Sequence, residues 1–122
     1  MSEKNKKILL ADDDPGILDA IGMILEMEGY EVSTTLNGNT ILSPETVIPD
    51  IYVLDIWMSG SDGRELCKKL KTGEKTKTIP VILISASNDL QRSAEGAGAD
   101  DFLAKPFEID ILLAKIKNCL QN

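Results

Sequence analysis

Short apolar runs that alternate with helix-like segments along the whole chain constrain its fold most. Most runs are apolar at consecutive positions, as a strand must be when both faces of its sheet are covered. They occupy residues 8–11, 51–54, 81–84 and 102–104, and a more polar, alternating strand is predicted at 30–36. Between the runs, apolar residues recur every three or four positions, the spacing of one buried helix face. The alternation predicts an α/β domain, with five parallel strands covered by helices on both faces.

Most of the expected helices begin at a residue that can cap them. Asp14 precedes Pro15, a favoured pairing at a helix N-terminus, and Asp62 and Asn88 stand at the corresponding position before later helices. Only a turn or two fits within 43–49, so the second helix is expected to be short. The last helix carries an apolar stripe made of Ile109, Leu112, Leu113, Ile116 and Leu120.

Size and charge limit what the chain can bind. Its 122 residues are enough for one domain, and we expect 1–122 to form a single one. A net charge of −7 disfavours direct contact with nucleic acid or with an anionic membrane surface. No apolar stretch approaches the length of a membrane span, and the run at 8–11 is too short for a signal-peptide core. We therefore expect a cytoplasmic protein.

The chain has no histidine. This excludes Ser-His-Asp and Cys-His nucleophile systems, histidine-ligated zinc and histidine general bases. The two cysteines, Cys67 and Cys119, lie in separate helical patterns and are expected to be free thiols. Chemistry must then depend on carboxylates, hydroxyls and lysine, with or without a metal ion.

Polar residues stand where the predicted strands end. In an open parallel sheet, ligands bind beyond the carboxyl ends of the strands. These positions hold Asp12, Asp13 and Asp14, then Asp55, Ser85 and Lys105. Any one of them alone could be a cap or a turn residue, and Asp14 is expected to be a cap. Their convergence on one edge of one sheet instead predicts a binding site.

Neighbouring carboxylates repel one another unless a cation joins them. A hard divalent ion suits oxygen ligands, and Mg²⁺ usually leaves coordination positions for water or a phosphate oxygen. Asp12, Asp13 and Asp55 with Mg²⁺ and Lys105 would have no net charge, so the pocket could accept a phosphoryl group. Asp55 could then be the nucleophile that forms an acyl phosphate, with Ser85 bonding the phosphoryl oxygens.

The chain resembles the receiver domain of bacterial two-component response regulators over almost its whole length. The similarity is carried by five segments in the same order, at 8–14, 50–55, 60–63, 80–86 and 98–107. The resemblance implies a flavodoxin-like (βα)5 fold with a parallel sheet of strand order 2-1-3-4-5. It also implies a phosphorylation switch that is not a turnover enzyme.

The resemblance assigns a role to each matching residue. Asp12 and Asp13 would be the acidic pair that holds Mg²⁺, with Asp13 a direct ligand, and Asp55 would be both phosphoacceptor and metal ligand. The backbone carbonyl of Trp57 would be the third protein ligand. The remaining roles are a switch hydroxyl, a switch aromatic and a phosphate-binding lysine, held by Ser85, Phe102 and Lys105. The Lys105–Pro106 peptide bond would be cis.

Partners also follow from the resemblance. The phosphoryl group would come from a phosphohistidine on a sensor kinase or a histidine phosphotransfer protein. On phosphorylation, Ser85 would move toward the phosphoryl group and Phe102 would turn into the space left behind. This would remodel the surface of the fourth helix, fifth strand and fifth helix, where a downstream partner would bind.

The sequence departs from the family pattern in several places. Ser59 stands where proline is usual, and Phe102 replaces a commoner tyrosine. The segment 85–98 is a residue or two shorter than usual. Trp57 is a large residue two positions after Asp55, and we hypothesise that it shields the acyl phosphate from water.

Three other functions are alternatives to this interpretation. A haloacid-dehalogenase-type phosphohydrolase needs a second aspartate two residues after the nucleophile, where this chain has Trp57. A flavodoxin needs a phosphate-binding loop of Ser, Thr and Gly, where this chain has three aspartates at 12–14. The third alternative is a receiver-like scaffold that is never phosphorylated.

Overall fold

The computed structural model describes residues 6–43, 47–58, 61–86 and 90–121. Its main sheet contains five parallel strands in the spatial order β2-β1-β3-β6-β7. These strands are β1 (Lys7–Ala11), β2 (Glu31–Thr35), β3 (Ile51–Asp55), β6 (Val81–Ser85) and β7 (Asp101–Ala104). Counted along the chain within this sheet, the order is 2-1-3-4-5, which confirms the predicted topology.

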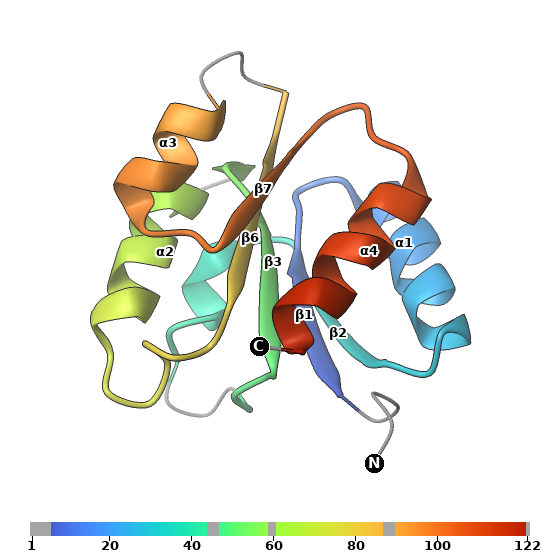
Figure 1. Cartoon of the computed structure of the whole chain (residues 1–122), viewed down its shortest axis with the longest axis horizontal. Coiled ribbons are helices and arrows are strands. Elements are labelled where there is room, and N and C mark those ends of the chain that lie inside the picture. The colour runs from blue at the N-terminus through green and yellow to red at the C-terminus, as the bar shows by residue number, and fades with distance from the viewer. Residues whose placement is uncertain (1–5, 44–46, 59–60, 87–89, 122) are drawn as a thin grey trace.

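Helices cover both faces of the sheet, as predicted (Figure 1). The helices α1 (Pro15–Met27) and α4 (Ile109–Leu120) lie on one face, and α2 (Gly63–Thr72) and α3 (Leu90–Ala97) on the other. The side chain of Asp14 accepts hydrogen bonds from the first amides of α1, and that of Asp62 accepts one from α2, so both predicted caps are confirmed. The predicted cap Asn88 lies outside the described residues.

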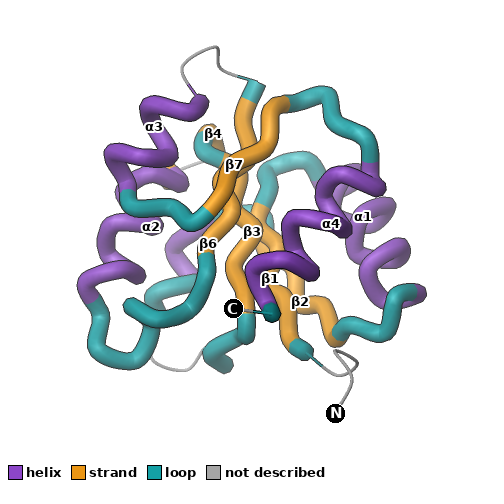
Figure 2. The backbone as a smooth tube through the Cα atoms, in the orientation of Figure 1, coloured by secondary structure: helices purple, strands orange, loops and turns teal. Residues whose placement is uncertain are grey.

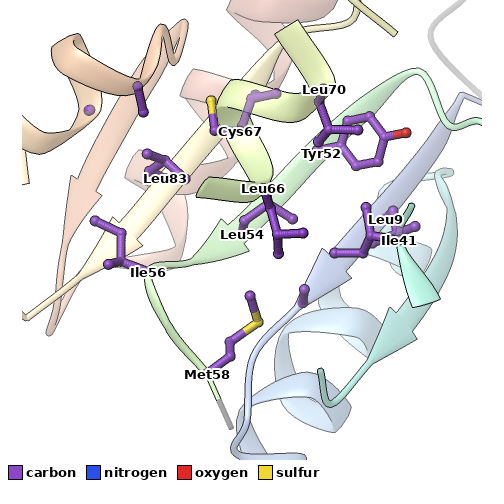
Figure 3. Packing of buried hydrophobic residues seen from close by; sticks show 14 residues of the cluster. Leu9, Ile41, Tyr52, Leu54, Ile56, Met58, Leu66, Cys67, Leu70 and Leu83 are labelled. Atoms are coloured by element: carbon purple, nitrogen blue, oxygen red, sulfur yellow. The ribbon is translucent and has the colours of Figure 1, made fainter. Parts of the chain in front are cut away.

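Alternate side chains of the central strands build two cores, one on each face of the sheet. Leu9, Tyr52 and Leu54 pack with α2 on one face (Figure 3), whereas Ile8 and Val53 pack on the α1 and α4 face. All five residues of β3 and all five of β6 are buried, which explains the unbroken apolar runs at 51–54 and 81–84 that precede the polar last residue of each strand. The strand β2 lies at the sheet edge and exposes several of its residues, as its alternating pattern predicted.

The expected short helix within 43–49 is not found in the described residues of this segment. Residues 44–46 lie outside the described ranges, and 41–43 and 47–50 contain no helix. A single 3₁₀ turn, η1 (Gly38–Thr40), precedes this segment. Prolines that cannot donate a hydrogen bond, and the restriction they impose on the preceding residue, disfavour helix here. The described chain therefore has four α-helices and not five.

A small hairpin that the sequence pattern did not predict follows β3. It pairs β4 (Trp57–Met58) with β5 (Ser61–Asp62) in antiparallel fashion, with Trp57 opposite Asp62. Met58 is buried and joins the core beneath α2 (Figure 3). The hairpin thus connects the end of β3 to the start of α2. Ser59, where the family usually has proline, lies outside the described residues.

The Lys105–Pro106 bond is cis, as the resemblance implied. Cys67 and Cys119 are free, and burial raises the pKa of Cys67 to about 11, so its thiol is protonated at neutral pH. Within the described ranges, no helix has both the length and the apolar character needed to cross a membrane.

Candidate functional site

Three carboxylates meet at the carboxyl ends of β1 and β3. Asp12 and Asp13 directly follow β1, and Asp55 is the last residue of β3. Because β1 and β3 are neighbouring parallel strands, their ends lie side by side. One oxygen from each of the three carboxylates lies within 4.8 Å of the others. Asp12 is 3% exposed and Asp55 5% exposed, whereas Asp13 faces solvent.

Lys105 reaches this group from the loop after β7. Its Nζ donates to Asp12 Oδ2 at 3.0 Å and to Asp55 Oδ2 at 3.1 Å. The sheet order brings together residues that are 93 and 50 positions apart in sequence. One ammonium among three carboxylates leaves two negative charges uncompensated.

Backbone amides hold the other oxygen of each buried carboxylate. Asp12 Oδ1 accepts from the amide of Asp14 at 3.0 Å, and Asp55 Oδ1 accepts from the amide of Trp57 at 3.3 Å. Each carboxylate is therefore bonded at one oxygen by the backbone and at the other by Lys105. This arrangement orients both side chains before any ligand arrives, a requirement for efficient electrostatic stabilisation.

The electrostatics of the buried groups reflect their crowding. Burial raises the pKa of Asp55 above its ordinary value, Asp12 adds to the rise, and the hydrogen bond from Lys105 opposes it. Burial acts against the charge of Lys105, but its bonds to Asp12 and Asp55 outweigh this and raise the pKa of the ammonium. A bound metal ion would favour the charged form of Asp55 and would act against the rise in its pKa.

The two expected switch residues lie on the neighbouring strands β6 and β7. Ser85 is the last residue of β6 and is fully buried. Its backbone carbonyl accepts a hydrogen bond from the amide of Lys105 at 2.9 Å, so Ser85 lies at the same edge of the sheet. Phe102 lies within β7, where it packs partly against the core beneath α2 and α3. The Nζ of Lys115 on α4 is 5.8 Å from the centre of its ring. Phe102 is therefore outside the carboxylate group itself.

Comparison with known proteins identifies the family. Residues 8–117 match the sequence model of the response regulator receiver domain. The chain belongs to this family. It is 36% identical over 120 residues to RpaA of Synechocystis, a DNA-binding dual master transcriptional regulator. The matched region covers 95% of this chain but 49% of that protein. The receiver domain spans about half the length, or less, of the curated relatives it matches.

Solved structures agree with the assignment. A CheY-like response regulator receiver domain protein from Methanospirillum hungatei superposes with a TM-score of 0.86 at 32% identity, covering 97% of this chain and 95% of that one. A BeF3-activated DrrB receiver domain gives a TM-score of 0.84 at 34% identity, with 97% and 99% covered. The receiver domain is thus a module of two-component signalling, as the resemblance implied.

Two features of the receiver domain's site were not predicted from the sequence. Gly63 begins α2 so close to the acceptor strand that a Cβ there would collide with the backbone carbonyl of Asp55. Arg64 stacks on Trp57, with its Cζ 4.7 Å from the ring centre, and also binds Asp62. In the sequence, Asp62 and Gly63 can be explained as an ordinary helix cap or turn. No sequence signal therefore indicates the close packing of Gly63 or the contact of Arg64 with Trp57.

The donor set of the receiver domain fits a divalent cation. Asp12, Asp13 and Asp55 are a group of described residues that could hold a metal ion. Their oxygens suit a hard cation, and two positive charges would compensate the excess that Lys105 leaves. Asp13 is exposed, so a cation bound there could also keep water molecules as ligands on that side.

Proposed function

We propose that the receiver domain accepts a phosphoryl group on Asp55 from a phosphohistidine of a sensor kinase or a histidine phosphotransfer protein. The observation that carries this is the buried, oriented carboxylate of Asp55, bonded to Lys105 beside Asp12. An oxygen of Asp55 forms the new P–O bond while the P–N bond of the donor breaks. The electron pair goes to the imidazole nitrogen, which takes a proton from solvent. The phosphoryl group then stays on Asp55 as the signal, so in this proposal the domain is a phosphoacceptor and not a turnover enzyme.

The surrounding residues have distinct roles in this proposal. Mg²⁺ would be held by Asp12, Asp13, Asp55 and the backbone carbonyl of Trp57, and would neutralise charge on the phosphoryl oxygens. Lys105 would pair with one of these oxygens, exchanging a carboxylate partner for it. The Ser85 hydroxyl, at the same edge, would bond another oxygen. Positioning and charge stabilisation of this kind account for most catalysis of phosphoryl transfer.

A groove beside the site supports a protein as phosphodonor. A cavity of about 530 Å³ adjoins Lys105 and is lined mainly by apolar residues of α1 and of the segment that runs from the end of β7 to the first residue of α4. Its lining includes Ile17, Ile21, Phe107 and Ile109. A helix of a kinase or phosphotransfer protein could cover this groove and bring its phosphohistidine to Asp55.

The output of the switch would be a second protein surface. Ser85 and Phe102 would change position together and alter the face formed by α3, β7 and α4. Lys115 joins these elements, because its Nζ is 2.9 Å from Asp101 Oδ1 in β7. We propose that a downstream protein binds this face. The net charge of −7 argues against direct contact with nucleic acid by this chain, and a cytoplasmic location agrees with such partners.

The first experiment is intact mass spectrometry after incubation with acetyl phosphate and Mg²⁺. We expect the wild-type chain to gain one phosphoryl group, and we expect EDTA or Asp55→Asn to abolish the gain. Asp100→Asn is a matched control, because Asp100 lies at the opposite end of the sheet and should leave the gain intact. If the folded wild-type chain never gains this mass, even with a purified histidine kinase, the proposal is wrong. The alternative, a receiver-like scaffold that is never phosphorylated, would then be favoured.

A further inference from the structure

Trp57, Asp62 and Arg64 form a compact cluster on the hairpin beside the acceptor; these three residues are called the Trp57 clamp below. Trp57 and Asp62 are cross-strand partners in β4 and β5. The Cζ of Arg64 lies 4.7 Å from the centre of the indole ring. Its Nε donates to Asp62 Oδ1 at 3.0 Å, and its Nη2 donates to Asp62 Oδ2 at 2.7 Å. Figure 2 places β4 at the end of the molecule where β3 ends.

The geometry of the clamp restrains more than a single surface ion pair would. A two-pronged bond to a carboxylate fixes the plane of the guanidinium, and the Cζ of this group lies over the indole ring. Asp62 is itself fixed, because its Oδ1 also caps α2 through the amide of Arg64 at 2.8 Å. Trp57 is 55% exposed, so without a partner its side chain would sample several rotamers. Arg64 therefore limits where the indole can go.

The clamp is joined to the acceptor through short backbone contacts. The amide of Trp57 donates to Asp55 Oδ1 at 3.3 Å. The amide of Gly63, the residue before Arg64, donates to the carbonyl of Ile56 at 2.8 Å. The acceptor, the indole and the start of α2 thus form one unit. A change in Arg64 reaches the rim of the site without altering a proposed metal or phosphate ligand.

We propose that Arg64 is a positioning residue that keeps the indole of Trp57 at the rim of the acceptor site and so prolongs the life of the phosphorylated state. This inference rests on the proposed function. In the reaction that ends this state, a water oxygen attacks phosphorus and the P–O bond to Asp55 breaks. Inorganic phosphate leaves, the carboxylate is restored, and a proton passes to solvent. An indole held at the rim reduces the approach of water, whereas a free indole does not.

The test follows two quantities in the same samples. After phosphorylation with acetyl phosphate and Mg²⁺, the donor is removed and the loss of the phosphoryl mass is timed. Trp57 is the only tryptophan in the chain, so acrylamide quenching of its fluorescence reports directly on the freedom of the ring. The variants are Arg64→Met, Arg64→Lys and Trp57→Ala. The control is Lys68→Met, which removes an exposed cation paired with Glu65 one turn along the same helix.

We expect Arg64→Met to hydrolyse about 2- to 5-fold faster and to be quenched more strongly, the size expected for losing one exposed cation–π contact. Arg64→Lys should restore part of both effects, because it keeps the charge but not the fork. Lys68→Met should match the wild type. The double variant of Arg64→Met with Trp57→Ala should be no faster than Trp57→Ala alone, because Arg64 acts through the ring.

Other results would overturn the inference. Rates that simply add in the double variant would mean that Arg64 does not act through Trp57. A ring that becomes free in Arg64→Met while hydrolysis stays unchanged would mean that the indole does not protect the phosphoryl group. Unchanged quenching would mean that Arg64 does not hold the ring. Failure of the wild type to gain the phosphoryl mass would instead contradict the proposed function, and the lifetime inference would fall with it.

Discussion

The receiver domain contains two lysine–aspartate clusters, at opposite ends of the same sheet. At the carboxyl ends of the strands, Lys105 joins Asp12 and Asp55. At the amino ends, Lys71 Nζ lies 2.6 Å from Asp100 Oδ2 and also donates to the carbonyl of Ile79 at 2.8 Å. Both clusters connect segments far apart in sequence, and both are partly shielded from water.

The two clusters differ in charge balance. In the Lys71 cluster, one cation meets one anion, and Asp100 Oδ2 also accepts the amide of Val81 at 2.8 Å. That cluster connects α2 to the start of β6, and its charges balance without a further ion. In the Lys105 cluster, the carboxylates outnumber the ammonium, so the site favours a further cation. The difference separates a structural fastening from a ligand site, although the residue types are the same.

The largest effect should come from removing the lysine of each cluster in turn. Lys105→Met should slow phosphorylation of Asp55 by about 100-fold or more, because a positioned charge on a transferring oxygen is lost. Lys71→Met should leave the rate within about 2-fold, since it lies at the far end of the sheet. The measurement is the rate of mass gain with acetyl phosphate. Equal losses in both variants would show that the two clusters do not differ as described.

The second effect concerns Mg²⁺ and folding stability. At about 100 times its dissociation constant, Mg²⁺ should raise the free energy of unfolding of the wild type by about 2.7 kcal/mol. Asp13→Asn should lose most of this gain, whereas Asp100→Asn should keep it. Urea unfolding with Mg²⁺ or with EDTA measures the difference. Retention of the full gain by Asp13→Asn would place the cation elsewhere.

The third effect is the pH dependence of stability without metal. The pKa of Asp55 is higher in the folded chain, mainly because of burial. Its protonated form therefore favours folding below the ordinary carboxyl pKa, and this contribution is lost as the pH rises through the raised value. Asp55→Asn should be more stable than the wild type near pH 7 by about 0.5–2 kcal/mol. The gap should close toward about pH 4 in urea unfolding series in EDTA. A gap that does not change with pH would contradict the assignment.

The smallest effect should be on the stability that the balanced cluster provides. Lys71→Met should lower the free energy of unfolding by about 1 kcal/mol, because Asp100 and the Ile79 carbonyl lose a charged donor. Lys68→Met removes a more exposed pair with Glu65 and should cost about 0.5 kcal/mol or less. Urea unfolding of the two variants under one set of conditions compares them. A larger loss for Lys68→Met would remove the basis for treating Lys71 as the fastening.

Most of the fold could be predicted because its signals are local. The apolar runs at 51–54 and 81–84 indicate strands that are buried on both faces, as β3 and β6 are. Asp14 and Asp62 cap helices through hydrogen bonds from residues two or three positions away. The helix predicted within 43–49 was wrong for the described residues of that segment, because a regular βα alternation was extended over a segment that contains two prolines. There the repeating pattern outweighed the local restriction.

The convergence of Asp12, Asp55 and Lys105 was predictable from topology, because parallel strands bring their carboxyl ends to one edge. The pairing of β4 with β5 and the position of Arg64 over Trp57 were not predictable. They depend on two-residue strands and on a side chain seven positions away, which leave no periodic pattern in the sequence.

The sequence by itself determined the strands and helices, the parallel sheet and the edge on which the reactive residues stand, because these follow from periodicity and chain direction. Only the tertiary structure decided the charge balance of each cluster and the position of the indole. Lys71 and Lys105 are both lysines near aspartates in the fold, and their roles differ because of how many carboxylates lie within reach of each. That number depends on distances between segments 29 to 93 residues apart, which composition and local pattern do not contain.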